Sequence, residues 1–94
     1  MPGTLIIKKN TVFKQVTRDE SVRPIPDTDK TPIIPAGQAF QFDSIEFKND
    51  RDGNSFEKHK HLAVRFSSPG VKPITGNAIL NWWVYADHVK EIKG

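Results

Sequence analysis

The chain has 94 residues, of which 36% are hydrophobic and 27% are charged, with no cysteine and a formal net charge of +3. This length supports one small domain with one modest core, so residues 1–94 are taken as a single domain. The composition excludes a disulfide framework and a membrane-spanning apolar run, and the weak positive charge permits binding to polyanions without demanding it. The first residues lack the apolar run of a secretory signal peptide, which leaves the compartment open.

The chain begins with two short apolar segments. Residues 4–7 are apolar after the first threonine and predict a first strand. Residues 11–16 are β-branched and aromatic and predict a second strand, or the continuation of the first past a kink. Lysines at 8, 9 and 14 suit a sheet edge that must avoid pairing with other chains.

Residues 17–35 differ in character, because they hold four of the seven prolines and show no periodicity. Proline cannot donate to a sheet ladder, so this stretch predicts a long, semi-rigid loop. Four apolar side chains could pin it to the rest of the domain, and we therefore expect an ordered loop. They are Val22, Ile25, Ile33 and Ile34.

A long strand is predicted over residues 38–48. Phe40 and Phe42 share one parity and Ile45 the other, which indicates a β-bulge near Asp43 and Ser44. Residues 49–54 are polar, contain Asp-Gly and predict a hairpin loop. Strict alternation then predicts a strand with Leu62, Val64 and Phe66 on one face, followed by a loop over residues 67–76.

Residues 77–92 hold both tryptophans and the only tyrosine. They predict a strand up to Tyr85, one tight turn at 86–88, and a short closing strand. Helical periodicity is nearly absent, so the fold class is all-β with five to six bent antiparallel strands. The expected core is Ile6, Val12, Phe13, Phe40, Phe42, Leu62, Val64, Phe66, Leu80, Trp82, Val84, Val89 and Ile92.

The strand, the turn at 86–88 and the pair Val89-x-x-Ile92 resemble the ending of SH3-like barrels, in which a short 3-10 turn leads into the last strand. The irregular loop 17–35 stands in the place of the RT loop, and the turn Pro35-Ala36-Gly37 is similar to that of bacterial SH3-like domains. The Ala-Leu-x-Asp-Tyr motif of eukaryotic SH3 domains is absent, and with it the tyrosines that bind polyproline. The resemblance implies a small non-catalytic barrel of the bacterial and phage type, often appended to cell-wall hydrolases and binding peptidoglycan or its peptide.

The aromatic strand suggests where a ligand would bind. If Leu80, Trp82 and Val84 face the core, then Ile79, Trp83 and Tyr85 share the outer face, where an exposed apolar line marks a binding surface. Cover by the chain's own loops or by an oligomer partner are the alternatives, and the opposite parity would expose Trp82.

We place the candidate groove between the loop 17–35 and the hairpin loop 49–54, floored by Trp83 and Tyr85. Loop polar groups and a neighbouring strand would add contacts. The candidate ligand-binding residues are Trp83, Tyr85, Ile79, Arg23, Asp52 and Arg65.

The histidines raise the question of a metal. His59 and His61 share a strand face, but the neighbouring Lys58 and Lys60 would repel a cation, so no metal site and no cofactor is predicted. His88 is expected to bond backbone carbonyls at the tight turn.

No nucleophile has a base beside it in the sequence, so the chain is not expected to be an enzyme. We expect a binding module that recognises a peptide or a cell-wall glycan-peptide, with no insertion into membranes. One alternative is a barrel that binds single-stranded nucleic acid through its lysines and rings. Another is a structural or oligomeric subunit of a phage or bacterial assembly, in which a partner protein covers the Trp83 face.

Overall fold

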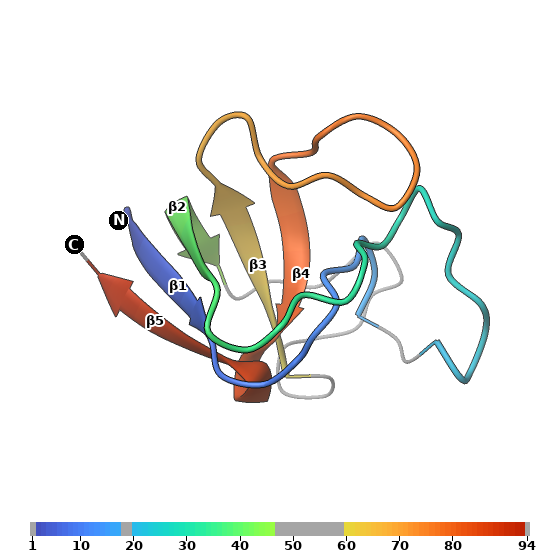
Figure 1. The fold of residues 1–94 in the computed structure, drawn as a ribbon, viewed down its shortest axis with the longest axis horizontal. Helices are drawn as coiled ribbons and strands as arrows, with labels where there is room; N and C mark the ends of the chain where they lie inside the picture. The colour runs from blue at the N-terminus through green and yellow to red at the C-terminus, as the bar shows by residue number, and fades with distance from the viewer. Residues whose placement is uncertain (1, 18–19, 47–59, 94) are drawn as a thin grey trace.

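The computed structural model describes residues 2–17, 20–46 and 60–93, and these residues are all-β (Figure 1). The elements follow in the order β1 (Gly3–Ile7), β2 (Ala39–Glu46), β3 (His61–Phe66), β4 (Asn81–Tyr85), the 3-10 turn η1 (Ala86–His88) and β5 (Val89–Lys93). The fold class expected from the sequence, antiparallel strands with one 3-10 turn near the C-terminus, is confirmed. No helix within the described ranges is long and apolar enough to cross a membrane.

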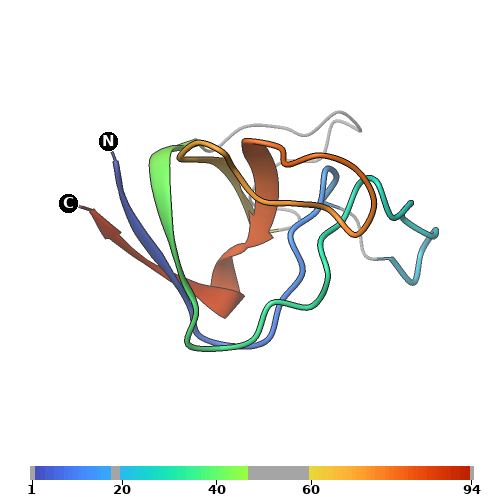
Figure 2. The same cartoon turned by 45° about the horizontal axis from the view of Figure 1, so that its top comes forward.

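The five strands form one antiparallel sheet in the order β4-β3-β2-β1-β5. β2 joins the two halves of the sheet, because its first part pairs with β1 and its second part pairs with β3. Phe42 stands at the junction and is paired with Gly3 on one side and Phe66 on the other. Figures 1 and 2 show the strands fanning out from β5 at one side to β4 at the other.

A register shift between Phe42 and Ser44 confirms the β-bulge expected near Asp43. Phe42, before the bulge, is 1% exposed, and Ile45, after it, packs against the same core although it has the opposite parity. An extra residue in one strand swaps the faces to which later side chains point. The bulge therefore lets both halves of β2 contribute to a single core.

β4 runs directly into η1, and η1 runs directly into β5. The carbonyl of His88 accepts hydrogen bonds from the backbone N–H groups of Lys8 (2.8 Å) and Lys9 (3.3 Å). These bonds fasten η1 to the end of β1, the strand with which β5 then pairs. The turn thus carries the chain from one edge of the sheet to the other.

The core consists of inward side chains of the strands together with Phe13 and Ile34, which come from the connection between β1 and β2. The ring centroid of Phe13 lies 5.4 Å from that of Phe40 and 5.0 Å from that of Phe66. Most of the expected core side chains are buried as predicted: Phe13, Phe42, Leu62, Val64, Phe66, Trp82, Val84 and Val89. Phe40 packs against them while partly buried.

Three expected core residues, Ile6, Val12 and Leu80, are only half-buried. In β1 the cause is strand alternation, because Leu5 and Ile7 point into the core and Ile6 therefore points to the other face. The assignment of Ile6 to the core was therefore wrong, and its neighbours Leu5 and Ile7 occupy the core instead. The side chain of Ile92 lies outside the described part of the structure.

Residues 11–16 do not form the expected second strand and make isolated bridges instead. Thr11 and Lys14 each pair with the chain at residues 30–34, but the ladder is interrupted between them. There the N–H of Phe13 donates to the side-chain Oγ1 of Thr31 (3.0 Å), and Pro32 has no N–H to give. A side-chain acceptor and a proline therefore replace the regular pairing that a strand requires.

The structure describes residue 17 and residues 20–35 of the loop that was predicted over residues 17–35. We call residues 20–35 the arm. Ile25 and Ile34 are buried, at 3% and 7% exposed, and anchor the arm as expected. Val22 and Ile33 were also expected to anchor it, and that expectation is wrong, because their side chains point away from the core.

Two backbone hydrogen bonds join the arm to the loop between β3 and β4. The N–H of Ile74 donates to the carbonyl of Lys30 (2.9 Å), and the N–H of Thr75 donates to the carbonyl of Asp27 (3.1 Å). Figure 1 shows the arm and this loop beyond β4, on the side of the sheet away from β5. The two segments therefore form one continuous border beside the sheet.

Candidate functional site

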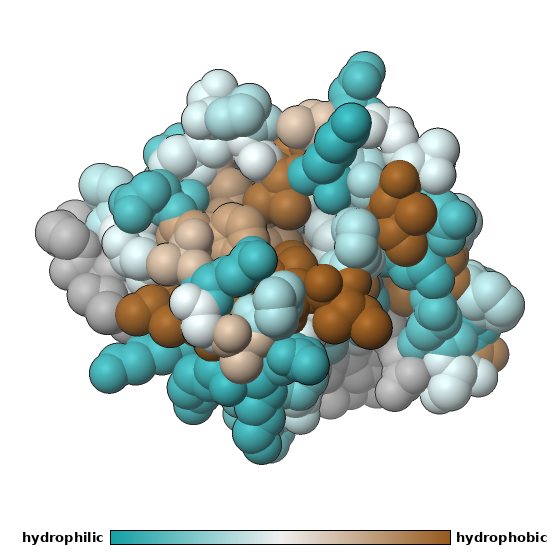
Figure 3. Space-filling model, in the orientation of Figure 1, coloured by the Kyte–Doolittle hydropathy of each residue, from teal (hydrophilic) through white to brown (hydrophobic). Residues whose placement is uncertain are grey.

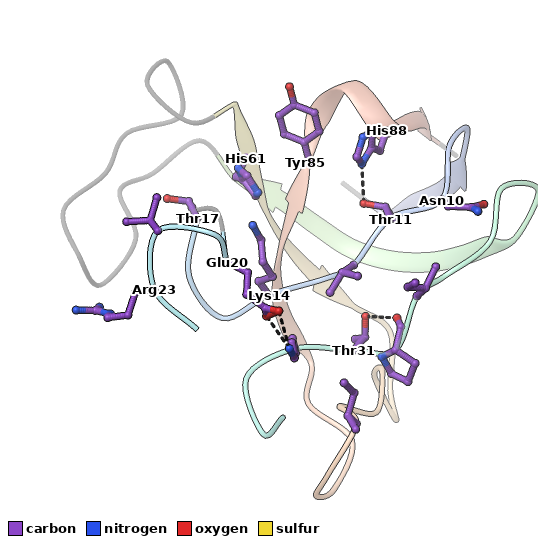
Figure 4. Close-up of a pocket in the computed structure, with 16 residues that line it drawn as sticks. Asn10, Thr11, Lys14, Thr17, Glu20, Arg23, Thr31, His61, Tyr85 and His88 are labelled. Carbon is purple, nitrogen blue, oxygen red and sulfur yellow. Dashed lines mark hydrogen bonds and ion pairs between the residues drawn. The ribbon is translucent and has the colours of Figure 1, made fainter. Parts of the chain in front are cut away.

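A groove runs between the arm, residues 10–17 and one end of the sheet (Figure 4). Its lining also includes the start of β3, the junction of β4 with η1, and Ile74 in the loop between β3 and β4. The groove encloses about 1430 Å³. Sites for small molecules usually measure about 300–1,000 Å³, so this groove has room for an extended ligand.

Three rings form a row at one end of the groove. The ring centroid of Tyr85 lies 5.4 Å from that of His61 and 4.7 Å from that of His88, with Tyr85 and His88 meeting edge to face. His61 and Tyr85 are direct cross-strand partners, which puts their side chains on one face of the sheet. His88 follows Tyr85 by three residues, one turn of 3-10 helix, and this spacing returns its ring to the same side.

Thr11 holds the ring of His88 in place, because its Oγ1 lies 2.9 Å from Nδ1 of the imidazole. The expected bonding of the His88 side chain to backbone carbonyls is therefore corrected. A hydroxyl beside an imidazole can be an activated nucleophile, but the Thr11 side chain is buried, at 5% exposed. The carboxylate of Asp87, next to His88 in the sequence, accepts a hydrogen bond from the Tyr85 hydroxyl at 3.2 Å and not from the imidazole. The Thr11–His88 pair therefore positions a ring at the groove wall.

The surroundings of this end shift two protonation equilibria. Burial lowers the pKa of His88, the ammonium groups of Lys9 and Lys14 lower it further, and Asp87 partly opposes them. The hydrogen bond to Asp87, together with the charge of that carboxylate, raises the pKa of Tyr85. At about pH 7 the imidazole of His88 is therefore neutral and the Tyr85 phenol is protonated.

Three large apolar side chains are exposed in the described part of the chain, and all three line the groove. They are Val22 (77% exposed), Ile33 (71%) and Ile74 (45%). Figure 3 shows apolar side chains among hydrophilic ones on the face that is seen in the orientation of Figure 1. Single exposed apolar residues are normal on a protein surface, but their concentration in one hollow marks a binding surface.

Charged side chains complete the lining: Lys14, Arg23, Lys30 and Glu20. The ammonium of Lys30 lies 2.6 and 2.9 Å from the two carboxylate oxygens of Glu20. This ion pair joins the first residue of the arm to Lys30, further along the arm, at the lining of the groove (Figure 4). The lining thus combines an apolar part, a row of rings and several charges.

Trp83 departs most clearly from the sequence-based expectation, because it is 9% exposed. The backbone N–H of Trp83 donates to the carbonyl of Lys14 (2.7 Å), and the carbonyl of Trp83 accepts from the backbone N–H of Lys14 (3.0 Å). The connection after β1 therefore lies along β4. Nε2 of Gln15 also donates to the carbonyl of Asn81, at 2.8 Å. The expectation that Trp83 is an exposed floor was therefore wrong, and the chain's own connection borders this strand.

The other candidate binding residues are distributed over the molecule. Tyr85 and Arg23 line the groove. Ile79 packs against the core and pairs with Val71, and Arg65 lies on β3 with its Nε 4.0 Å from the carboxylate of Asp43. Asp52 lies outside the described residues, as does the loop 49–54 that was expected to form the second wall.

Sequence reasoning missed the apolar part of the groove. Ile33 and Ile74 each follow a proline directly, at Pro32 and Pro73. An apolar residue beside a proline in a loop cannot easily enter a strand ladder, so it either anchors the loop or stands exposed. That pattern was visible in the sequence, but which of the two outcomes applies depends on the fold.

No group of three His, Cys, Asp or Glu side chains suited to a metal occurs among the described residues. His59 lies outside the described residues. Comparisons with protein-family models, with curated proteins and with solved structures give no match.

Proposed function

We propose that this chain is a non-catalytic binding module that holds an extended peptide, free or as the peptide part of a cell-wall glycan-peptide, in the groove. One observation carries the proposal: every large apolar side chain exposed in the described residues lines this one groove. The row of Tyr85 and His88 beside them adds rings that can stack on a peptide or bond to it. Burial of these side chains by a ligand would remove apolar surface from water, the usual source of affinity.

The strand order supports the further proposal that the domain is SH3-like. A first strand, a long irregular connection, a bulged strand, a pair of adjacent strands and a 3-10 turn before the last strand follow in the order of such barrels. In this proposal the arm takes the place of the RT loop. The groove beside it would be the site at which the module holds its ligand.

Binding to a peptide array tests this function. We expect the chain to bind a subset of random extended peptides and the variant Ile33→Ala to bind them roughly tenfold more weakly, because one apolar contact at a binding hot spot contributes about 1–2 kcal/mol. Lys90→Gln on β5, an exposed change away from the groove, is the matched control. Equal binding by wild type and Ile33→Ala would overturn the proposal. Co-sedimentation with purified sacculi distinguishes a cell-wall peptide from a free one.

A second candidate function follows from the same exposed side chains. A second copy of the chain could cover Val22, Ile33 and Ile74, which would make the groove an oligomer contact. Light scattering decides between the two, since a strict monomer at high concentration counts against self-association. A dimer that Ile33→Ala dissociates would support it.

A further inference from the structure

We propose that the buried hydroxyl of Thr11 fixes the imidazole of His88 as the tautomer that carries its hydrogen on Nε2, so that the groove offers this N–H to a backbone carbonyl of the bound peptide. This inference rests on the proposed function and adds the polar contact that orients the ligand. His88 is then a binding residue, and Thr11 is a positioning residue that acts through it.

Both partners of the Thr11–His88 contact are held by the fold. The backbone N–H of Thr11 donates to the carbonyl of Ile34 (3.0 Å), and the carbonyl of Thr11 accepts from the N–H of Ile34 (2.7 Å). The carbonyl of His88 accepts from the N–H groups of Lys8 and Lys9, which fastens η1 to the end of β1. The 2.9 Å between Oγ1 of Thr11 and Nδ1 of His88 therefore joins two anchored segments (Figure 4).

The burial of Thr11 decides which of the two atoms donates. The side chain is 5% exposed, so its hydroxyl hydrogen needs an acceptor within the protein. In the described part of the chain, Nδ1 of His88 is the one hydrogen-bond partner of Oγ1. A hydrogen on Nδ1 would make the imidazole the donor and leave the buried hydroxyl hydrogen without an acceptor, which is costly. Donation from the hydroxyl to a bare Nδ1 avoids this cost and leaves the imidazole hydrogen on Nε2.

The surroundings of His88 keep the imidazole neutral, which is the state in which a tautomer is defined. Burial and the ammonium groups of Lys9 and Lys14 lower its pKa, against the opposing charge of Asp87. The ring of Tyr85 also faces it, with His61 beyond Tyr85. Near pH 7, about the ordinary pKa of the group or above it, one nitrogen of the ring therefore carries a hydrogen and the other accepts.

Nε2 is the ring atom that remains for a ligand. The half-buried ring of His88 lines the groove. Within the residues that the structure describes, Nε2 makes no hydrogen bond, and it is not enclosed by protein atoms. An extended peptide presents a backbone carbonyl at every residue, and a carbonyl is a neutral acceptor for such a donor. The groove would then hold a peptide by apolar contacts along the arm and by one directed hydrogen bond at the row of rings.

NMR of the full chain tests the tautomer without any ligand. Long-range proton–nitrogen spectra at about pH 7.5 distinguish the two ring nitrogens, and His88→Phe identifies their signals by removing them. We expect the hydrogen on Nε2 in wild type and in Thr11→Ser, which keeps the hydroxyl. Thr11→Val keeps the shape of the side chain without the hydroxyl and should give a mixture of tautomers. A hydrogen on Nδ1 in wild type, or a tautomer that Thr11→Val leaves unchanged, would overturn the inference while the proposed function stands.

Peptide binding tests the donor. Peptides from a phage-displayed random library that wild type retains and Ile33→Ala loses are counted as groove ligands. His88→Phe, which keeps a ring but has no N–H, should bind them roughly three- to tenfold more weakly, the usual effect of one neutral hydrogen bond. Lys90→Gln, away from the groove, should bind them as wild type does. Equal binding by wild type and His88→Phe would contradict the inference.

An ester scan of one such peptide locates the carbonyl. Each peptide bond in turn is replaced by an ester, whose carbonyl is a weaker acceptor. One ester position should weaken binding to wild type and have no effect on binding to His88→Phe, because the contact is already absent in that variant. Ester positions that all affect both proteins alike would overturn the inference. Absence of any peptide that distinguishes wild type from Ile33→Ala would overturn the proposed function as well.

Discussion

Lys14 and Trp83 exchange two backbone hydrogen bonds, at 3.0 and 2.7 Å, although Lys14 lies in the connection between β1 and β2 and Trp83 lies in β4. The pairing lays residues that line the groove along the edge of β4. It also explains why a tryptophan on the outer face of the sheet is nearly buried. The same two hydrogen bonds therefore cover the edge of β4 and hold the groove wall in its position.

Trp83→Ala should lower the free energy of unfolding by about 3–5 kcal/mol, because it removes a large buried side chain and leaves a cavity. Urea denaturation followed by circular dichroism measures the loss. Trp83→Phe, which keeps an aromatic ring, should lose less. An unfolding free energy unchanged by Trp83→Ala would show that this side chain is exposed.

Substitution of two adjacent isoleucines in the arm should change the free energy of unfolding by very different amounts. Ile34 is 7% exposed and belongs to the core, so Ile34→Ala should lose about 2–5 kcal/mol of unfolding free energy. Ile33 is 71% exposed, so Ile33→Ala should change it by no more than about 0.5 kcal/mol. Thermal melts of the two variants side by side measure the contrast. A similar loss for both would contradict the separation of anchor from groove surface.

Gly70→Ala should destabilise the domain by more than about 2 kcal/mol, since two penalties combine there. Gly70 has a φ of +89°, and a Cβ at this position would collide with the backbone carbonyl of Ile79. Gly37 also has a positive φ, +97°, but a Cβ there meets nothing within 4 Å. Gly37→Ala is therefore the control that isolates the backbone strain, and chemical denaturation of both variants gives the comparison. Equal losses would contradict the close approach at Ile79.

The pKa of His88 predicts how stability depends on pH. Its folded-state pKa lies below the ordinary value of 6.5, so the unfolded state binds this proton more readily. The contribution of His88 to stability is present above about pH 6.5 and is lost as the pH falls toward the folded-state pKa. Urea midpoints for wild type should therefore decrease more between about pH 7.5 and pH 5.5 than those for His88→Gln. A pKa of His88 above 6.5 in an NMR titration would contradict this.

Local sequence patterns predicted the regular part of the fold. The alternation of Leu62, Val64 and Phe66 fixed the faces of β3, and the parity change between Phe42 and Ile45 located the bulge. Each of these signals lies within a few residues, so no knowledge of distant contacts is needed to read it. The same is true of the turn at Ala86–His88 between two apolar runs.

The groove could not be predicted in this way, because its parts come from segments far apart in the sequence. Alternation correctly separated the faces of Trp82 and Trp83, but it carries no information about which segment lies over the outer face. Val22 and Ile33 belong to a proline-rich stretch without periodicity, where nothing local distinguishes an anchor such as Ile25 from an exposed side chain. Contacts with segments that are distant in the sequence decide these positions.

The bonds that join the arm to the loop after β3 have a consequence for the entropy of association. Because the N–H of Ile74 is bonded to Lys30 and that of Thr75 to Asp27, apolar and charged parts of the groove are held in a fixed relation before any ligand arrives. Ordering loops during binding reduces affinity, so a prearranged border spares the complex that loss. Discrimination between ligands would then follow from the spacing of their side chains, more than from how far the domain can adapt to them.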